Sequence, residues 1–344
     1  MNRIAIFLVL LSLPIAVRAE KIVVATADTI QPFAVDFDTE GNIFFVEMNG
    51  GERLKKLLPD GKVEVLAGTG KKGLAGDGGD AMKAEFNGMH NLAIAPQGGY
   101  YLADTFNNCI RKYDPATKKV EAFAGTGKKA FSGDGGDALK AEFSQPICIA
   151  LTPDGATLYV ADIGNKRVRA IQTKTGIVTT IAGTGKAGVP KDGEPAKDQP
   201  LVDPRAVTVD AKGNLYILER GGHALRVVDK EGKIRTVAGT GKAGKGGDGG
   251  SALSAAMNGP KFLSIDLDGS VLIADTENHQ IRRYLPGKEI MELVAGKGTK
   301  GKGGLDGDPK MVELARPHGV SVHPKTGELY IADSDNNRVL KIVK

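Results

Sequence analysis

The sequence lacks tryptophan and contains only two cysteines, Cys109 and Cys148. Small secreted domains that depend on disulfides are rich in cysteine, so the stability of this chain is not built on cysteine. Both thiols fall in expected strands of neighbouring units. The sequence leaves open whether they form one bridge or remain buried free thiols.

The chain also lacks a long hydrophobic run. Its apolar N-terminal stretch, residues 4–17, is interrupted by Pro14 and is shorter than the roughly 20 residues that a spanning helix needs. This pattern predicts a signal peptide over residues 1–19, cleaved after Ala19, with an uncleaved anchor as the alternative. The mature protein is then expected to be secreted or periplasmic and to have no membrane span.

A strong excess of one charge is missing as well. The chain has 46 basic and 41 acidic side chains, a formal net charge of +5. Loss of Arg3 and Arg18 with the predicted signal peptide lowers it to +3. Nucleic-acid-binding proteins usually carry clustered positive charge, so neither a nucleic-acid partner nor an RNA-reading role is predicted.

Glycine is abundant, with 47 residues, and much of it belongs to an internal repeat. Six segments, from "IFFVE" to "LYIAD", end in an acidic residue, and the successive spacings are 57, 58, 57, 56 and 58 residues. These acidic residues are Glu47, Asp104, Asp162, Glu219, Asp275 and Asp333. Spacings this regular indicate six copies of one structural unit.

Each unit contains four short β-rich runs separated by Asp-Gly, Gly-Asn and Thr-Gly turn signals. Six four-stranded antiparallel sheets around an axis make an all-β, six-bladed β-propeller, predicted here for residues 20–344. The last unit ends after its third strand, whereas an extra β-like run, residues 21–27, precedes the first unit. The N-terminal run is therefore expected to complete the last blade and to close the ring.

Units such as "QPICIALTPDGATLYVADIGNKRVRAIQTKTGIVTTIAGTG" and "GVSVHPKTGELYIADSDNNRVLKI" resemble NHL repeats over residues 21–344. Inserts such as "FSGDGGDALKAEF" are similar to those of bacterial secreted NHL proteins. More distantly, the chain resembles propellers of the SMP-30/gluconolactonase and amidating-lyase kinds. The resemblance implies the fold and leaves the function open, because related propellers bind ligands, read RNA or catalyse reactions.

Two glycine-rich patterns suggest ligand sites at first sight. "GTGKKG", from Gly68, resembles a phosphate-binding loop, but close variants follow the last strand of five units, so a repeated turn is predicted instead. "GDGGD", from Gly76, has aspartates at partial calcium-loop spacing but lacks the full set of ligands. A structural Ca²⁺ and simple backbone capping by aspartate both remain open there.

The start of each first strand offers the most informative residues. Its second residue should point into the mouth of the central channel, and these six ring residues are Phe33, His90, Ile147, Arg205, Lys261 and His318. The resemblance to amidating lyases implies a zinc held by histidines in alternate blades. Here the alternate blades hold His90, Arg205 and His318, and arginine cannot bind zinc.

Two histidines and a water remain an alternative zinc site. The resemblance to gluconolactonases implies carboxylate and asparagine ligands for a divalent metal, and only Asn91 matches that pattern. No cofactor is assigned, with Ca²⁺ or Zn²⁺ as the possibilities.

The ring residues are instead predicted to bind an anionic group, because two cations and two histidines meet at one cavity. The predicted ligand-binding residues are His90, Asn91, Arg205, Lys261 and His318. The alternative is that the cations merely pair with neighbouring acids.

No catalytic residue is assigned. Glu47 and Glu219 are weak candidates for an acid and a base, and an ion pair between Glu219 and Arg205 is the structural alternative. His223 and His279 are expected to be solvated in loops, and His323 is expected to cap a turn.

Together these features favour a monomeric propeller outside the cytoplasm. It is expected to bind a protein, or an anionic small molecule or saccharide, through the face that carries the inserts. The alternative hypothesis is a metal-dependent hydrolase or lyase of the gluconolactonase or amidating-lyase type.

Overall fold

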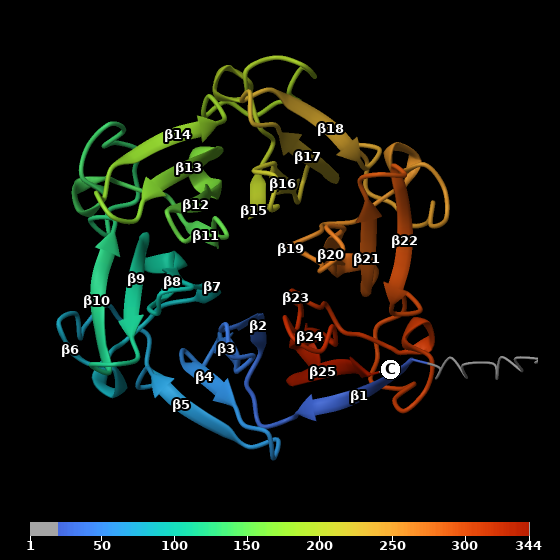
Figure 1. The fold of residues 1–344 in the computed structure, drawn as a ribbon, viewed down its shortest axis with the longest axis horizontal. Helices are drawn as coiled ribbons and strands as arrows, with labels where there is room; N and C mark the ends of the chain where they lie inside the picture. The colour runs from blue at the N-terminus through green and yellow to red at the C-terminus, as the bar shows by residue number, and fades with distance from the viewer. Residues whose placement is uncertain (1–19, 344) are drawn as a thin grey trace, which may run out of the picture.

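A computed structural model describes residues 20–343, and the predicted signal peptide lies outside the described residues. Within this range six antiparallel sheets are arranged around a central axis (Figure 1). Five sheets have four strands, and the sheet of blade 2 has a fifth, two-residue strand contributed by an insert. The predicted six-bladed all-β propeller is confirmed.

Each blade runs from an inner strand beside the axis to an outer strand at the periphery (Figure 1). Blade 1 comprises β2 (Pro32–Phe37), β3 (Ile43–Glu47), β4 (Leu54–Leu57) and β5 (Val63–Ala67). Blade 2 comprises β7 (Met89–Ile94), β8 (Tyr100–Asp104), β9 (Cys109–Asp114) and β10 (Lys119–Ala124), with β6 (Gly79–Asp80) at the edge. Blade 3 comprises β11 (Pro146–Leu151), β12 (Thr157–Asp162), β13 (Arg167–Gln172) and β14 (Val178–Ala182). Blade 4 comprises β15 (Pro204–Val209), β16 (Leu215–Glu219), β17 (Ala224–Val228) and β18 (Ile234–Ala238). Blade 5 comprises β19 (Phe262–Ile265), β20 (Val271–Asp275), β21 (Gln280–Leu285) and β22 (Ile290–Ala295). Blade 6 comprises β23 (Gly319–Val322), β24 (Leu329–Asp333), β25 (Arg338–Val343) and β1 (Lys21–Thr26). The six acidic residues that define the repeat are the last residues of the second strands.

The ring is closed by the N-terminal strand, as the sequence predicts. Strand β1 pairs antiparallel with β25, so that Lys21 lies opposite Val343 and Ile22 lies opposite Ile342. Ile22 is fully buried. Because β1 comes from one end of the chain and β25 from the other, this pairing ties the two ends together in one sheet (Figure 1).

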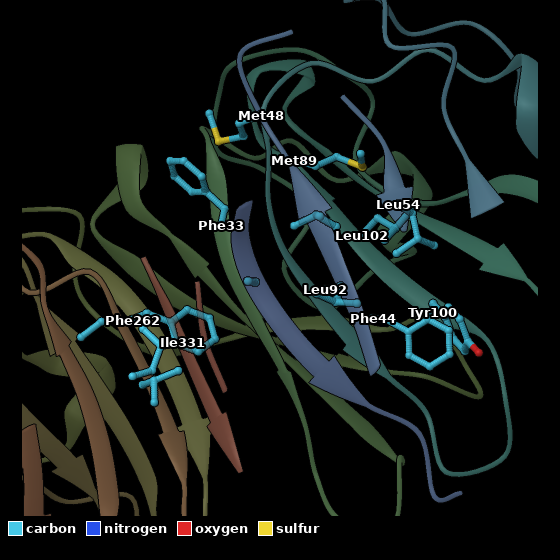
Figure 2. Packing of buried hydrophobic residues seen from close by; sticks show 14 of the residues in the cluster. Phe33, Phe44, Met48, Leu54, Met89, Leu92, Tyr100, Leu102, Phe262 and Ile331 are labelled. Carbon is cyan, nitrogen blue, oxygen red and sulfur yellow. The ribbon is translucent and has the colours of Figure 1, made fainter. Parts of the chain in front are cut away.

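The core lies between neighbouring blades, because the alternating side chains of each strand pack against the next sheet. One cluster runs from blade 5 through blades 6 and 1 to blade 2, and Figure 2 shows part of it. Between blades 1 and 2, the ring of Phe44 meets that of Tyr100 edge to face at 4.8 Å. Phe44 and Leu102 are each at most 2% exposed, so the aromatic-poor chain still has a dense core.

The inserts fold against the outer strands. In the first insert, Ala81, Ala84 and Phe86 are completely buried, and the Asp80 carboxylate caps a turn by accepting from the Met82 N–H at 3.0 Å. Residues 81–83 of this insert form a 3₁₀ turn. In the described chain, the 3₁₀ turns of the inserts are η1 (Ala81–Lys83), η3 (Ala138–Lys140), η5 (Ala196–Asp198), η6 (Ala252–Ser254) and η8 (Pro309–Met311). The others follow second strands: η2 (Thr105–Asn107), η4 (Ile163–Asn165), η7 (Thr276–Asn278) and η9 (Ser334–Asn336).

The aspartate of the "GDGG" motif holds a buried arginine. The Arg111 Nε lies 2.8 Å from the Asp77 carboxylate, and its Nη1 donates to the Glu85 carbonyl at 2.6 Å. Arg111 is fully buried. The same ion pair recurs between Arg169 and Asp134 and between Arg282 and Asp248. The motif thus fastens each of these inserts to the third strand of its blade.

The "GTG" motif forms a turn that only glycine fits. Gly125 has a φ of 97°, and a side-chain carbon there would lie 2.7 Å from the Asn108 carbonyl oxygen. Glycine tolerates both the positive φ and the close approach. The interpretation of this motif as a structural turn is supported.

Both cysteines, Cys109 and Cys148, are buried and free. No helix among the described residues is long and apolar enough to span a membrane.

Candidate functional site

The ring residues are placed by irregularities at the start of the inner strands. In blades 1 to 4 the strand carries a β-bulge, and the ring residue is the extra residue. In blades 5 and 6, Lys261 and His318 directly precede the paired strand residues. A bulge interrupts the alternation of side chains and redirects one of them. This feature turns one residue of each of these four blades toward the axis.

The structure brings His90, Arg205, Lys261 and His318 together at one end of the channel. The His318 imidazole stacks on Phe33 at 4.1 Å, and Phe33 meets His90 edge to face at 5.1 Å. The Lys261 Nζ lies 3.5 Å from the His318 Nε2. The charge of Arg205 acts on both histidines.

This ring is a packed layer, and its six residues are between 5% and 9% exposed. Burial lowers the pKa of His90 to about 3, and the Arg205 charge lowers it further. Burial and Lys261 hold the pKa of His318 well below its ordinary value. Both imidazoles are therefore neutral near pH 7, and the positive charge of the ring belongs to Arg205 and Lys261.

The two cations of the ring differ in their partners. The Lys261 Nζ forms an ion pair with Glu277 at 2.7 Å, and Glu277 is shared with Arg316 at 2.8 Å. Arg205 forms no ion pair with any residue of the described chain. Burial lowers its pKa to about 10, so the guanidinium remains charged. Arg205 is a buried cation whose charge is left uncompensated.

Asn91 does not belong to this packed layer. Its Oδ1 accepts from the Ile149 N–H at 2.9 Å, which links blades 2 and 3, and the residue is 2% exposed. Asn91 lines the channel just below the ring. It is an inter-blade contact at the upper end of the cavity described below.

The two candidate catalytic carboxylates have structural partners. Glu47 lies 2.8 Å from Lys55 and accepts from the Ile30 N–H at 2.7 Å. Glu219 lies 2.7 Å from Arg226 and accepts from the Val202 N–H at 2.6 Å. The expectation of an ion pair between Glu219 and Arg205 was wrong, because Arg226 reaches Glu219 from the adjacent strand.

Two histidines that were expected to be solvated in loops do lie in loops, but they are half-buried and hydrogen-bonded. His223 and His279 occupy left-handed positions, and their Nδ1 atoms accept from the Gly259 and Arg316 N–H groups, each at 3.1 Å. They join consecutive blades. His323 does cap a turn, because its Nδ1 accepts two backbone N–H groups at 3.1 Å.

A cavity of about 300 Å³ lies in the channel below the ring. It is lined by all six inner strands and extends to the exposed Pro96 and Pro153, at the ends of those strands opposite the ring. Its polar side chains are Asp36, Asn91, Cys148, Thr152, Thr208, Ser264 and Ser321.

Sequence reasoning overlooked Asp36. The signal was available, since the matching position holds Ala93, Ala150, Thr208, Ser264 and Ser321 in the other blades.

Metal ligands do not gather in the described part of the chain. Among residues 20–343, no three His, Cys, Asp or Glu side chains lie close enough together to hold a metal ion. In the alternate blades that would supply three zinc ligands, His90 and His318 are joined by Arg205, and Lys261 lies beside His318. A Zn²⁺ bound there would face two cations. The residues of the ring do not fit a catalytic zinc.

Comparison with known proteins agrees with this architecture. A family model described as "NHL repeat" matches residues 314–342, in blade 6. The chain is a six-bladed propeller whose last blade contains an NHL repeat. The protein SUPPRESSOR OF QUENCHING 1 of Arabidopsis thaliana is 26% identical over 346 residues, covering 96% of this chain and 32% of the relative. The chain thus spans about a third of that relative's length.

Solved structures share the propeller fold. An auxiliary nutrient binding protein from Bacteroides ovatus superposes with a TM-score of 0.67 at 14% identity, covering 94% of this chain and 76% of that chain. A virginiamycin B lyase from Staphylococcus aureus gives a TM-score of 0.57 at 14% identity, covering 94% and 99%. At this identity the likeness establishes the fold alone.

Proposed function

We propose that this NHL propeller is a secreted or periplasmic binding protein that holds an anionic group at the insert-bearing end of its channel. The ligand is an anionic small molecule or saccharide, or an acidic group of a partner protein. The proposal depends on one observation, the uncompensated Arg205 guanidinium in the ring.

A buried charge without a partner is costly, because burial removes its hydration. Arg205 is 5% exposed, and its charge acts on the two neutral imidazoles of the ring, those of His90 and His318. An anion beside it would be attracted in a medium of low dielectric constant, where charges interact strongly. The planar guanidinium can also donate two parallel hydrogen bonds to a carboxylate, sulfate or phosphate.

Similar propellers offer independent support for binding. The related structure from Bacteroides ovatus is named an auxiliary nutrient binding protein, and a small nutrient is a ligand of the size that the channel cavity could hold. The predicted signal peptide is consistent with a location outside the cytoplasm. N-terminal sequencing of the exported protein tests it, and a mature chain that begins at Glu20 is the expected result.

The alternative, a metal-dependent hydrolase or lyase, has weaker support. The two neutral histidines of the ring favour it, whereas the adjacent cations oppose a divalent metal. We therefore derive no metal-assisted step from this site. Stoichiometric Zn²⁺ or Ca²⁺ that survives dialysis, and that is lost in the double variant His90→Ala/His318→Ala, would favour the enzyme instead.

Anion binding is tested by calorimetry with sulfate, phosphate, acetate and gluconate, on the wild type and on Arg205→Met/Lys261→Met. The affinity of the double variant for the anion is expected to be at least tenfold lower, a difference of about 1.4 kcal/mol in binding free energy. Arg235→Met/Lys288→Met is the matched control, since both residues are exposed and outside the channel. Undiminished binding in the first pair, or equal loss in the control pair, would contradict the proposal.

A further inference from the structure

The channel carries a basic and an acidic group at two levels. Arg205 lies at the ring, and Asp36 lies three residues beyond the ring residue Phe33 on β2. At about 3.3 Å per strand residue, the two levels are about 10 Å apart along the channel. Like Arg205, Asp36 forms no ion pair with any described residue.

The carboxylate of Asp36 is fixed in the channel wall. Its Oδ1 accepts from the Phe37 N–H at 2.9 Å, and its Oδ2 accepts from the Ile94 N–H of blade 2 at 3.1 Å. Burial raises the pKa of Asp36 to about 7, although both hydrogen bonds lower it. A cation beside this carboxylate would favour its charged form.

Other polar groups of the wall have partners in neighbouring blades. Ser264 Oγ donates to the Val320 carbonyl at 2.7 Å, and Ser321 Oγ donates to the Val35 carbonyl at 2.6 Å. Cys148 Sγ accepts from the Val207 N–H at 3.5 Å. These bonds join neighbouring blades, as the bond from Ile94 to Asp36 also does. Arg205 and Asp36 differ from these groups in that each is ionisable and has no ion-pair partner among the described residues.

The cavity extends from just below the ring past the level of Asp36. Its lining begins with Asn91, Cys148 and Phe262, directly below the ring, and includes Asp36. Arg205 is not among the lining residues, but Val207, two residues further along β15, lines the cavity, so Arg205 belongs to the layer that roofs it. A volume of about 300 Å³ is at the lower end for sites that bind small organic molecules.

We propose that the channel binds a small zwitterion, with its acid group at Arg205 and its ammonium group at Asp36. This inference rests on the proposed function, because it uses the same anion site, and it adds the chemical class of the ligand. A zwitterion provides a partner for the buried guanidinium and for the half-buried carboxyl group at once. The separation of the two levels favours an ω-amino acid over an α-amino acid, whose charged groups share one carbon.

The test is calorimetric titration of the full mature chain with ω-amino acids, from glycine to 6-aminohexanoate. Each is compared with the carboxylic acid of equal length that lacks the amino group. The best amino acid is expected to bind at least tenfold more tightly than its matching acid. In Asp36→Asn this advantage should disappear while binding of the acid alone persists.

The Asp36→Asn substitution keeps the shape of the side chain and an oxygen acceptor, and circular dichroism checks that the variant folds. Asp60→Asn, in an exposed turn outside the channel, is the matched control and should retain the full advantage. The comparison within the wild type requires no variant, so it remains decisive if Asp36→Asn does not fold.

The failures can be told apart. If acids bind through Arg205 but an amino group adds no affinity at any length, the zwitterion proposal is overturned and the anion site stands. If neither acids nor amino acids bind the wild type, or if Arg205→Met binds them unchanged, both proposals fail. An advantage that persists in Asp36→Asn also overturns the assignment of the ammonium group.

Discussion

Blades 1 and 4 differ from the other four blades at the end of the second strand. In blade 3, Asp162 accepts from a backbone N–H at 2.7 Å and from Asn165 at 2.8 Å. In blade 4, the longer Glu219 accepts from a backbone N–H at 2.6 Å and pairs with Arg226, and Gly222 stands where blade 3 has Asn165. The backbone contact is the same, so the glutamates take the structural place of the Asp-Asn pair.

The largest expected effect is the loss of this carboxylate in either type of blade. Glu219→Ala removes the partner of Arg226 and leaves a buried cation, which should lower the free energy of unfolding by about 3–5 kcal/mol. Asp162→Ala should be milder, because Arg169 still pairs with Asp134. Urea denaturation measures both. Equal losses would mean that the two arrangements do not differ in their dependence on the ion pair.

The next effect tests whether the two arrangements can be exchanged. A side-chain carbon at Gly222 would lie 2.6 Å from the Glu219 Oε2, so Gly222→Asn alone should destabilise the protein. The double variant Glu219→Asp/Gly222→Asn copies blade 3. Its coupling energy should be favourable by about 1–3 kcal/mol in a double-mutant cycle. Additive losses would refute the equivalence of the blades.

Two arginines of blade 4 sharpen the comparison between paired and unpaired charges. Arg226→Met leaves the buried Glu219 carboxylate without its ion-pair partner and should destabilise the protein. Arg205→Met removes an uncompensated cation and should leave the stability unchanged or raise it by about 1 kcal/mol. Thermal denaturation in the absence of ligand measures both changes. A marked loss of stability in Arg205→Met would show that Arg205 has a structural role.

The smallest effect concerns pH. Burial lowers the pKa of His279 below its ordinary value of 6.5, so the unfolded chain binds the proton more readily. The stability that His279 contributes is therefore complete above about pH 6.5 and is lost as the pH falls below it.

Blades 2 and 6 place Asn108 and Asn337 at the same left-handed position, where each accepts the corresponding N–H. His279→Asn should change stability by less than about 0.5 kcal/mol at pH 8. It should also reduce the loss on acidification from pH 7 to pH 5, measured by denaturation. If the loss of stability between pH 7 and pH 5 is the same in His279→Asn as in the wild type, His279 does not titrate in this window.

Much of the fold could be predicted because the repeats show which segments of the chain are structurally equivalent. The regular recurrence of Asp104, Asp162 and their counterparts set the number of blades, and the leftover strand at residues 21–27 identified the closure. The ring residues followed from the same alignment. Their bulges could not be foreseen, because a bulge depends on the register with the second strand.

The partners of charged side chains could not be predicted in this way. Glu219 lies closer in sequence to Arg226 than to Arg205, but only the packed sheet shows that Arg226 reaches it. His223 and His279 lie in glycine-containing or polar loops that look solvated, yet their imidazoles join blades. Asp36 could have been noticed as the one acidic residue at its repeat position, but its place in the channel wall was not visible.

The sequence by itself determined the repeating architecture, because strand periodicity, turn glycines and unit length are local properties of the chain. The tertiary structure alone decided which charges are compensated, because that depends on distances between residues of different strands and blades. For this reason the sequence revealed the six-bladed NHL propeller, whereas the unpaired Arg205 and Asp36, on which the functional proposals rest, emerged only once the ring had closed around the channel.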